Sequence, residues 1–189
     1  MAEFEIKDGV AIIPEGVTEI GNDAFHGCTS LESITIPEGV TKIGYGSFSR
    51  CTSLKSITIP KSVTTIKRDA FAGCTSLKSV TIPTSVMEIG YDVFLGCTSL
   101  ESIVVAEGNP VYDSRECCNA IIETKTNTLC HGCKSTIIPD SVVRIHYNAF
   151  AGCASLESIV IPKGVTEIGQ HAFRGCTSLK SIAIPESVA

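Results

Sequence analysis

Apolar and polar residues alternate along this chain in short stretches that recur every 23 residues. One copy, residues 59–81, reads Ile-Pro-Lys-Ser-Val-Thr-Thr-Ile-Lys-Arg-Asp-Ala-Phe-Ala-Gly-Cys-Thr-Ser-Leu-Lys-Ser-Val-Thr. Full copies begin at Ile13, Ile36, Ile59, Ile82, Ile138 and Ile161, and a partial copy begins at Ile184. A repeat of this length predicts a solenoid, because a single unit cannot bury its apolar side chains and has to stack on its neighbours.

The first stretch of each copy has the pattern of a half-buried strand. In residues 31–37, Ile34 and Ile36 alternate with Ser33 and Thr35. Pro37 follows and is expected to end the strand, because proline has no N–H for a further ladder bond.

A second extended stretch, Val-Thr-x-Ile, follows and leads into a turn. Glycine comes after it in most copies, and we expect it to supply a bend with positive φ. These glycines are Gly21, Gly44, Gly90 and Gly169. Lys67 and His146 occupy the position in two other copies, so the bend does not strictly require glycine. The next segment, x-x-Ala-Phe-x-Gly-Cys, is expected to form one or two helical turns, too short to be stable alone.

Stacking the copies places equivalent side chains in columns that make up the predicted core. One column contains the leucines Leu31, Leu54, Leu77, Leu100, Leu156 and Leu179. Another contains the phenylalanines Phe25, Phe48, Phe71, Phe94, Phe150 and Phe173. Adjacent strands of a sheet lie about 4.7–4.9 Å apart, so neighbouring rings are expected to stack along the solenoid axis.

The repeats predict one continuous domain, 1–189, with one irregular coil. We divide it into an N-terminal cap (1–12), four regular coils (13–104), an expanded coil (105–137), and two regular coils plus a truncated third (138–189). Residues 108–110, Gly-Asn-Pro, mark a turn. Residues 120–123 and 128–130 flank residues 124–127 and predict a hairpin or an enlarged loop. Such an irregular surface on a regular scaffold is a common place for function, and a tolerated insertion is the alternative.

The repeat Leu-x-x-Ile-x-Ile-Pro-x-x-Val-x-x-Ile-Gly-x-x-Ala-Phe-x-x-Cys resembles the leucine-rich repeats of BspA-like (Treponema-type) proteins over about residues 12–188. The resemblance implies a right-handed leucine-rich-repeat superhelix or horseshoe with a concave parallel sheet. Short second strands and short helical turns would lie on its outer side. It also implies a secreted or cell-surface protein that serves adhesion and protein binding.

Charge and composition exclude several classes of function. The formal net charge is −5, from 15 basic and 20 acidic residues that alternate along the chain, so no clustered basic face points to nucleic acid. The chain has no apolar run of about 18 residues, which a membrane-spanning helix would require. Residues 1–7 lack the pattern of a signal peptide, so a cytoplasmic protein and a piece of a longer secreted chain both stay open.

Most of the ten cysteines follow the repeat and are expected to be reduced and buried. Free cysteine behaves as a small apolar side chain, and parallel side chains in a column do not point toward each other as a disulfide requires. These ladder cysteines are Cys28, Cys51, Cys74, Cys97, Cys153 and Cys176. Cys133 is expected to occupy the same position in the expanded coil.

The remaining cysteines allow alternatives, and catalysis is not expected. Cys130 and Cys133 with Cys117 and Cys118 could form a zinc site, but Cys-x-x-Cys alone is weak support. A Cys117–Cys118 disulfide and a free reactive thiol are further alternatives. We expect no metal and no cofactor. No histidine is paired with a recurring serine or carboxylate in a catalytic arrangement, and the sequence has no phosphate-binding glycine loop. We therefore expect that the chain is not an enzyme.

The predicted binding surface for a protein partner is the inner strand face, together with exposed tyrosines on the turns. The strand-face residues are Glu32, Ser33, Thr35, Lys55, Ser56, Thr58, Lys78, Ser79, Thr81 and Glu101, and the tyrosines are Tyr45, Tyr91 and Tyr147. A host extracellular or surface protein is one candidate partner. The alternatives are an ordinary solvated sheet face, a structural spacer of a larger surface protein, and an ice- or crystal-binding array of Ser and Thr. The uncapped last coil also predicts a weak homodimer.

Overall fold

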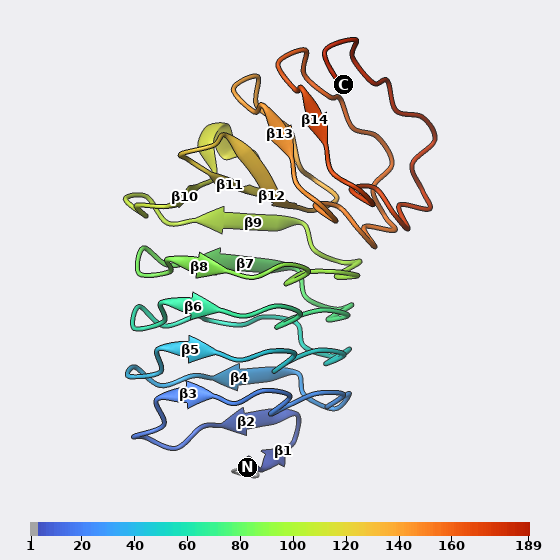
Figure 1. Cartoon of the computed structure of the whole chain (residues 1–189). Coiled ribbons are helices and arrows are strands. Elements are labelled where there is room, and N and C mark those ends of the chain that lie inside the picture. Colours follow the sequence, from blue (N-terminus) through green and yellow to red (C-terminus); the bar gives the residue numbers. More distant parts are fainter. Residues whose placement is uncertain (1–3) are drawn as a thin grey trace.

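The computed structural model describes residues 4–189 as a β-solenoid whose coils stack one on the next (Figure 1). The predicted solenoid of 23-residue coils is confirmed. The strands are β1 Ile6–Lys7, β2 Val10–Ile12, β3 Glu19–Ile20, β4 Ser33–Thr35, β5 Lys42–Ile43, β6 Thr65–Ile66, β7 Ser79–Ile82, β8 Glu88–Ile89, β9 Ser102–Val105, β10 Tyr112–Asp113, β11 Ala120–Glu123, β12 Thr128–Gly132, β13 Arg144–Ile145 and β14 Glu167–Ile168. One short 3₁₀ segment, η1, spans Arg115–Cys117.

Two parallel ladders run along the regular coils. In the first ladder β2 pairs with β4 and β7 with β9, and an isolated bridge joins Ser56 to Ser79. In the second ladder the strand order is β3-β5-β6-β8. Ile20 lies beside Ile43, Ile43 beside Ile66, and Ile66 beside Ile89, a register that equals the repeat length. Equivalent side chains therefore stack into columns.

The N-terminal cap closes the first coil. β1 pairs antiparallel with β2 and so covers the outer edge of the first ladder. The ring of Phe4 stacks on Phe25 at a centroid distance of 5.1 Å. Residues 1–3 of the predicted cap lie outside the described residues.

The predicted core columns are buried between the two ladders. Phe25, Phe48 and Phe71 are at most 1% exposed. Their rings stack nearly parallel, at 5.2 Å and 5.4 Å between successive centroids. The column of leucines is equally buried from Leu31 to Leu156. The apolar side chains of each coil are thus covered only when the neighbouring coils are in place.

The segment expected to be helical is instead a run of tight turns. The N–H groups of Asp23, Phe25 and Gly27 donate to the carbonyls of the next coil, at 2.7–2.8 Å. These donors are therefore not free for the bonds of an α-helix. The backbone takes positive φ at Asp23 (54°) and Gly27 (69°), which a helix does not allow.

The glycines after the second stretch have a different role from the one expected. Gly44, Gly90 and Gly169 do not adopt positive φ. A Cβ on Gly90 would lie 2.4 Å from the backbone nitrogen of Arg68, and one on Gly169 would lie 2.4 Å from that of Tyr147. Glycine at this position therefore allows close approach to the preceding coil.

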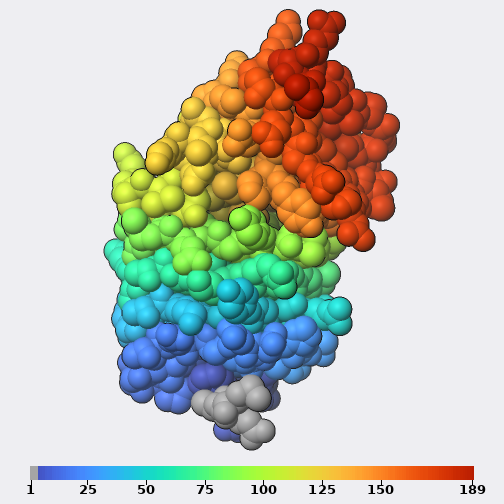
Figure 2. Space-filling model, in the orientation of Figure 1, coloured from blue at the N-terminus to red at the C-terminus, as the bar shows by residue number. Residues whose placement is uncertain are grey.

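The expanded coil forms the predicted hairpin and acts as a wedge. β10, β11 and β12 are antiparallel, and β12 continues in parallel into β13 and β14. The expanded coil lacks the run of tight turns that precedes the cysteine in the regular coils, so the Gly96 N–H donates directly to the Ala151 carbonyl of the next coil at 3.3 Å. Only one side of the solenoid is thickened. The C-terminal coils accordingly lean toward the turn side (Figures 1 and 2).

β11 is shared between two hydrophobic cores. Ile121 belongs to the N-terminal core, and the flanking Ala120 and Ile122 belong to the C-terminal core. The phenylalanine column is interrupted here, because His131 packs edge-on against Phe94 with 5.8 Å between ring centroids. The two halves of the solenoid therefore meet on the wedge.

Candidate functional site

The predicted strand face is exposed, and the structure brings its Ser and Thr side chains onto one surface of the N-terminal coils. Thr35, Thr58 and Thr81 are exposed, and the row continues as the apolar Val104. Residues 158–160 and 181–183 form no strand, so the described first ladder ends at β9. The polar surface therefore spans four coils rather than the whole chain.

The charged row on this face is largely neutralised by its own ion pairs. Lys55 Nζ lies 2.5 Å from the Glu32 carboxylate, and Lys134 Nζ lies 2.8 Å from that of Glu101. The hydrogen bond from Lys134 lowers the pKa of Glu101 below its ordinary value. Lys134, in the expanded coil, was not predicted to belong to this row.

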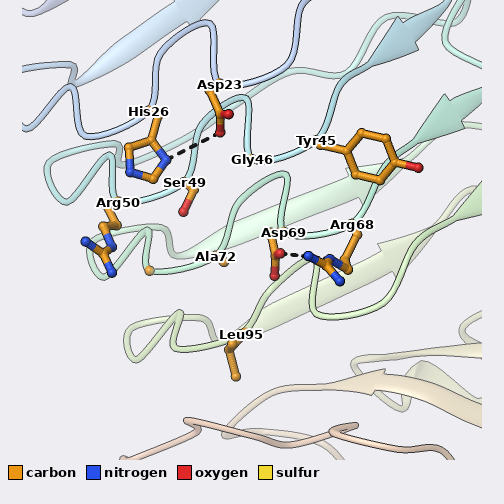
Figure 3. A pocket seen from close by; sticks show the side chains of 11 residues that line it. Asp23, His26, Tyr45, Gly46, Ser49, Arg50, Arg68, Asp69, Ala72 and Leu95 are labelled. Atoms are coloured by element: carbon orange, nitrogen blue, oxygen red, sulfur yellow. Dashed lines mark hydrogen bonds and ion pairs between the residues drawn. The ribbon is translucent and has the colours of Figure 1, made fainter.

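A second candidate surface is a shallow hollow of about 540 Å³ on the turn side of the first four coils. Arg50 and His26 lie at one end of it, and Tyr45 and Arg68 lie at the other (Figure 3). Arg68 Nε pairs with the Asp69 carboxylate at 3.0 Å. Burial raises the pKa of Asp69, although Arg68 acts in the opposite direction. The hollow carries both signs of charge and follows the repeat.

A third candidate surface is a groove of about 420 Å³ where the second ladder is interrupted. We call it the junction groove. β8 and Tyr91 line it from the N-terminal half, the β11–β12 hairpin from the wedge, and Arg144, His146 and Tyr147 from the C-terminal half.

Two side chains of the expanded coil cause this interruption. The Ile89 N–H donates to the Tyr112 hydroxyl at 3.2 Å, where another strand would supply a carbonyl. The Asn109 amide donates to the carbonyls of Pro83 (3.0 Å) and Val86 (2.9 Å). Asn109 and Tyr112 each lie 23 residues after the residues whose backbone they hold, Val86 and Ile89. The fifth coil thus supplies two side chains, and no strand, at this edge of the ladder.

The groove brings together two of the three predicted tyrosines. Tyr91 is 59% exposed and stacks on His146, with 5.3 Å between ring centroids. Tyr147 is 43% exposed and packs edge-on against His171 at 5.9 Å. Tyr45 lies apart, in the turn-side hollow.

His131 is buried and lines the inner wall of this groove. Its Nε2–H donates to the Gly90 carbonyl at 3.1 Å. Burial lowers the pKa of His131 to about 4, so the imidazole is neutral near neutral pH.

The charged side chains of the groove differ in whether they have an ion-pair partner. Glu88 pairs with Lys67 at 2.6 Å, and Arg144 pairs with Glu167 at 2.8 Å. Glu123 accepts a hydrogen bond from the Thr126 hydroxyl and forms no ion pair within residues 4–189. Sequence reasoning missed Glu88, Glu123 and Arg144. The 23-residue offset from Val86 to Asn109 could have shown that the ladder ends here.

The ladder cysteines are reduced and form a hydrogen-bonded column. The thiols of Cys51, Cys74, Cys97 and Cys176 each donate to the carbonyl of a phenylalanine in the preceding regular coil, as from Cys51 to Phe25 at 3.0 Å and from Cys97 to Phe71 at 3.1 Å. The Cys153 thiol, which follows the wedge, donates to the Gly132 carbonyl instead. Burial raises the pKa of both thiols to about 12. All ten cysteines are free. Cys133 precedes the same turn as the others, but it follows a strand, and its thiol lies 3.4 Å from the Asn119 carbonyl.

The cysteines of the expanded coil do not converge. Cys117 is exposed, Cys118 is buried, and the Cys130 thiol lies 3.5 Å from the Thr128 carbonyl. Between residues 4 and 189 no group of three or more His, Cys, Asp or Glu side chains is arranged to hold a metal ion. In the same part of the chain, no helix has the length and apolar character that crossing a membrane requires.

Stacked coils, short strands and buried leucine and phenylalanine columns define a leucine-rich-repeat scaffold. The chain belongs to the family described as BspA type leucine rich repeat region, whose model matches residues 9–115 and 120–189 in six copies. No curated protein matches the chain.

Several solved structures are similar. A leucine rich cell surface protein from Faecalibacterium prausnitzii is 34% identical over 90% of this chain and 58% of its own, with a TM-score of 0.60. The T. pallidum leucine rich repeat protein is 30% identical over 94% of this chain and 70% of its own, with a TM-score of 0.56. The pneumococcal vaccine antigen PcpA shares the fold at a TM-score of 0.80 and 24% identity, over 95% of this chain. The chain spans 51% of the length of PcpA.

Proposed function

We propose that this chain is a non-enzymatic scaffold that binds a protein partner at a cell surface. The observation that carries this proposal is the exposure of Tyr91 and Tyr147 in the junction groove. Exposed tyrosines are enriched at protein interfaces because the ring supplies contact area and the hydroxyl supplies a hydrogen bond. The likeness to the cell surface protein from F. prausnitzii supports the proposed location.

The polar strand face is the second proposed docking surface. Its small side chains leave the sheet accessible across four coils, and solenoids commonly bind along such extended surfaces. Its ion pairs, such as Glu32 with Lys55, leave little net charge for a partner to recognise. We therefore assign the strand face a supporting role and the junction groove the specific one.

An array of immobilised extracellular-matrix and serum proteins tests this function. The wild-type chain is expected to bind at least one of them saturably. The double variant Tyr91→Ala/Tyr147→Ala is expected to lose most of that binding. Tyr45→Ala, a matched exposed tyrosine outside the groove, is expected to retain it. A wild-type chain that binds nothing on the array would contradict the proposal and favour a structural spacer.

A weak homodimer through the last coil stays a proposal of its own. Phe173, Leu179 and Ile182 are only partly buried, and Ile184 is 52% exposed. Light scattering at high concentration is expected to show reversible self-association that Ile184→Lys abolishes. Val160→Lys, at an exposed residue of the preceding coil, is the control and should leave the association unchanged.

A further inference from the structure

We propose that the junction groove binds an arginine or lysine side chain of an extended peptide segment in the partner. This inference rests on the proposed protein-binding function and assigns the chemistry of the partner at the same groove. Four properties of the groove carry it: its unpaired carboxylate, its exposed rings, its edge strand and its surplus of acceptors.

The unpaired carboxylate is that of Glu123. The other two charged side chains of the groove, Glu88 and Arg144, have partners of opposite charge on the same ladder. Within residues 4–189 the Glu123 carboxylate has only the hydroxyl of Thr126 as a partner, which is neutral. A cationic side chain in the groove would complete this pairing, whereas an acidic one would meet a like charge.

The rings of Tyr91 and Tyr147 provide a second attraction for a cation. Both tyrosines are exposed and line the same groove. His146 stacks on one face of Tyr91 at 5.3 Å, which fixes the ring while the tyrosine stays 59% exposed. A guanidinium or ammonium group over an aromatic face is attracted by the ring quadrupole, and guanidinium groups also stack on such rings.

The backbone of β8 favours a peptide as the carrier of that side chain. β8 pairs with β6 on one side and is the last strand of its ladder in the described chain. An extended peptide can add to such an edge by main-chain hydrogen bonds. The Ile89 N–H is already bonded to Tyr112, so the edge offers acceptors rather than donors. The main-chain N–H groups of an extended peptide are donors that suit such an edge.

Peptide titration followed by ¹H–¹⁵N NMR tests the proposal on the full 189-residue chain. The probe is acetyl-Val-Thr-Arg-Val-Thr-amide, and the controls are the same peptide with citrulline or glutamate in place of arginine. The arginine peptide is expected to shift the amide signals of residues 88–91, 123–128 and 144–147. Citrulline keeps the shape and loses the charge, so it is expected to bind at least threefold more weakly.

Two matched variants locate the contact. Glu123→Gln is expected to weaken binding of the arginine peptide by about two- to fivefold, the range for one exposed ion pair. Glu38→Gln removes an exposed carboxylate from a distant loop and is expected to change nothing. Thermal melting of each variant checks that the fold is retained.

Several outcomes would overturn the proposal. These are equal binding of the citrulline peptide, signal shifts outside the groove, or no effect of Glu123→Gln. Shifts at the same residues by maltotriose, without any by the arginine peptide, would assign the groove to carbohydrate instead. Array proteins that bind equally well to wild type and Glu123→Gln would contradict this inference alone. A silent array would contradict the protein-binding function, whatever the peptide does.

Discussion

Phe150 packs directly against the backbone of Gly132. A Cβ placed on Gly132 would lie 2.1 Å from Cε1 of the Phe150 ring. Gly132 ends β12 in the wedge, and Phe150 is the first fully buried phenylalanine of the C-terminal core. No phenylalanine ring stacks between Phe94 and Phe150, and the contact of Phe150 with Gly132 packs the C-terminal coils against the wedge instead.

Gly132→Ala is therefore expected to destabilise the chain. The ring of Phe150 is buried and cannot move without disturbing its own packing, so overpacking should cost about 2–3 kcal/mol in the free energy of unfolding. Urea denaturation measures the loss. Gly21→Ala is the control, because a Cβ there meets no atom within 4 Å and φ is not positive. Equal stability of the two variants would contradict the proposed packing of Phe150 against the backbone of Gly132.

Truncating rings at different places along the column should have unequal effects. Phe71→Ala removes a ring that is 0% exposed and stacked on both sides, and is expected to cost about 3–5 kcal/mol. Phe173→Ala is expected to cost less, because that ring is only partly buried and, among the described residues, stacks on Phe150 alone. Urea denaturation of both variants compares the costs. Equal losses would speak against a stack in which each coil is supported only by its neighbours.

Thiol reactivity should separate the cysteines by position. Cys51 and Cys97 are buried and have pKa values raised to about 12, so their thiolate fraction is small near neutral pH. Cys117 is exposed and is expected to react first with a thiol reagent, with the ladder cysteines following only as the fold opens. Mass spectrometry of the native protein after timed labelling shows the order. Several ladder disulfides in that protein would contradict the hydrogen-bonded column.

His131 should make stability depend on pH. Its folded-state pKa, about 4, lies below its ordinary value of 6.5, so the fold favours the neutral imidazole. The contribution is complete above about pH 6.5 and is lost as the pH falls toward 4, for a total of roughly 3 kcal/mol. Urea denaturation at several pH values should show a shallower decline for His131→Gln than for wild type. His26→Gln, at an exposed histidine, should decline as wild type does.

The regular coils could be predicted from the sequence because their pattern reports directly on burial. Leu54 and Phe71 recur at 23-residue intervals, and only stacking can cover such columns. The prediction of a helical turn was wrong because hydrogen bonds between coils compete with hydrogen bonds within a single coil. At Phe25, for example, the N–H donates to the Ser47 carbonyl of the next coil. The role of Gly90 was misassigned because the nearness of Arg68 is a property of stacked backbones.

The candidate site could be predicted only in part. Tyr91 and Tyr147 were recognised as exposed tyrosines at equivalent positions of two copies. Their sharing of one groove depends on the missing turn of the expanded coil, which brings Asn148 within 2.8 Å of Asp92. The sequence also did not indicate that Glu123 belongs to the groove, because its lack of an ionic partner follows from the path of the hairpin.

Hydrogen exchange on binding tests the central claim, that the junction groove is the specific binding site, most directly. The 189-residue chain is compared alone and saturated with the array protein that it binds most strongly. Binding at the groove predicts slower exchange in residues 88–91, 123–131 and 144–147, with smaller changes in residues 33–35 and 56–58 of the strand face. Protection confined to the strand face, or to the turn-side hollow around Arg50, would contradict the claim.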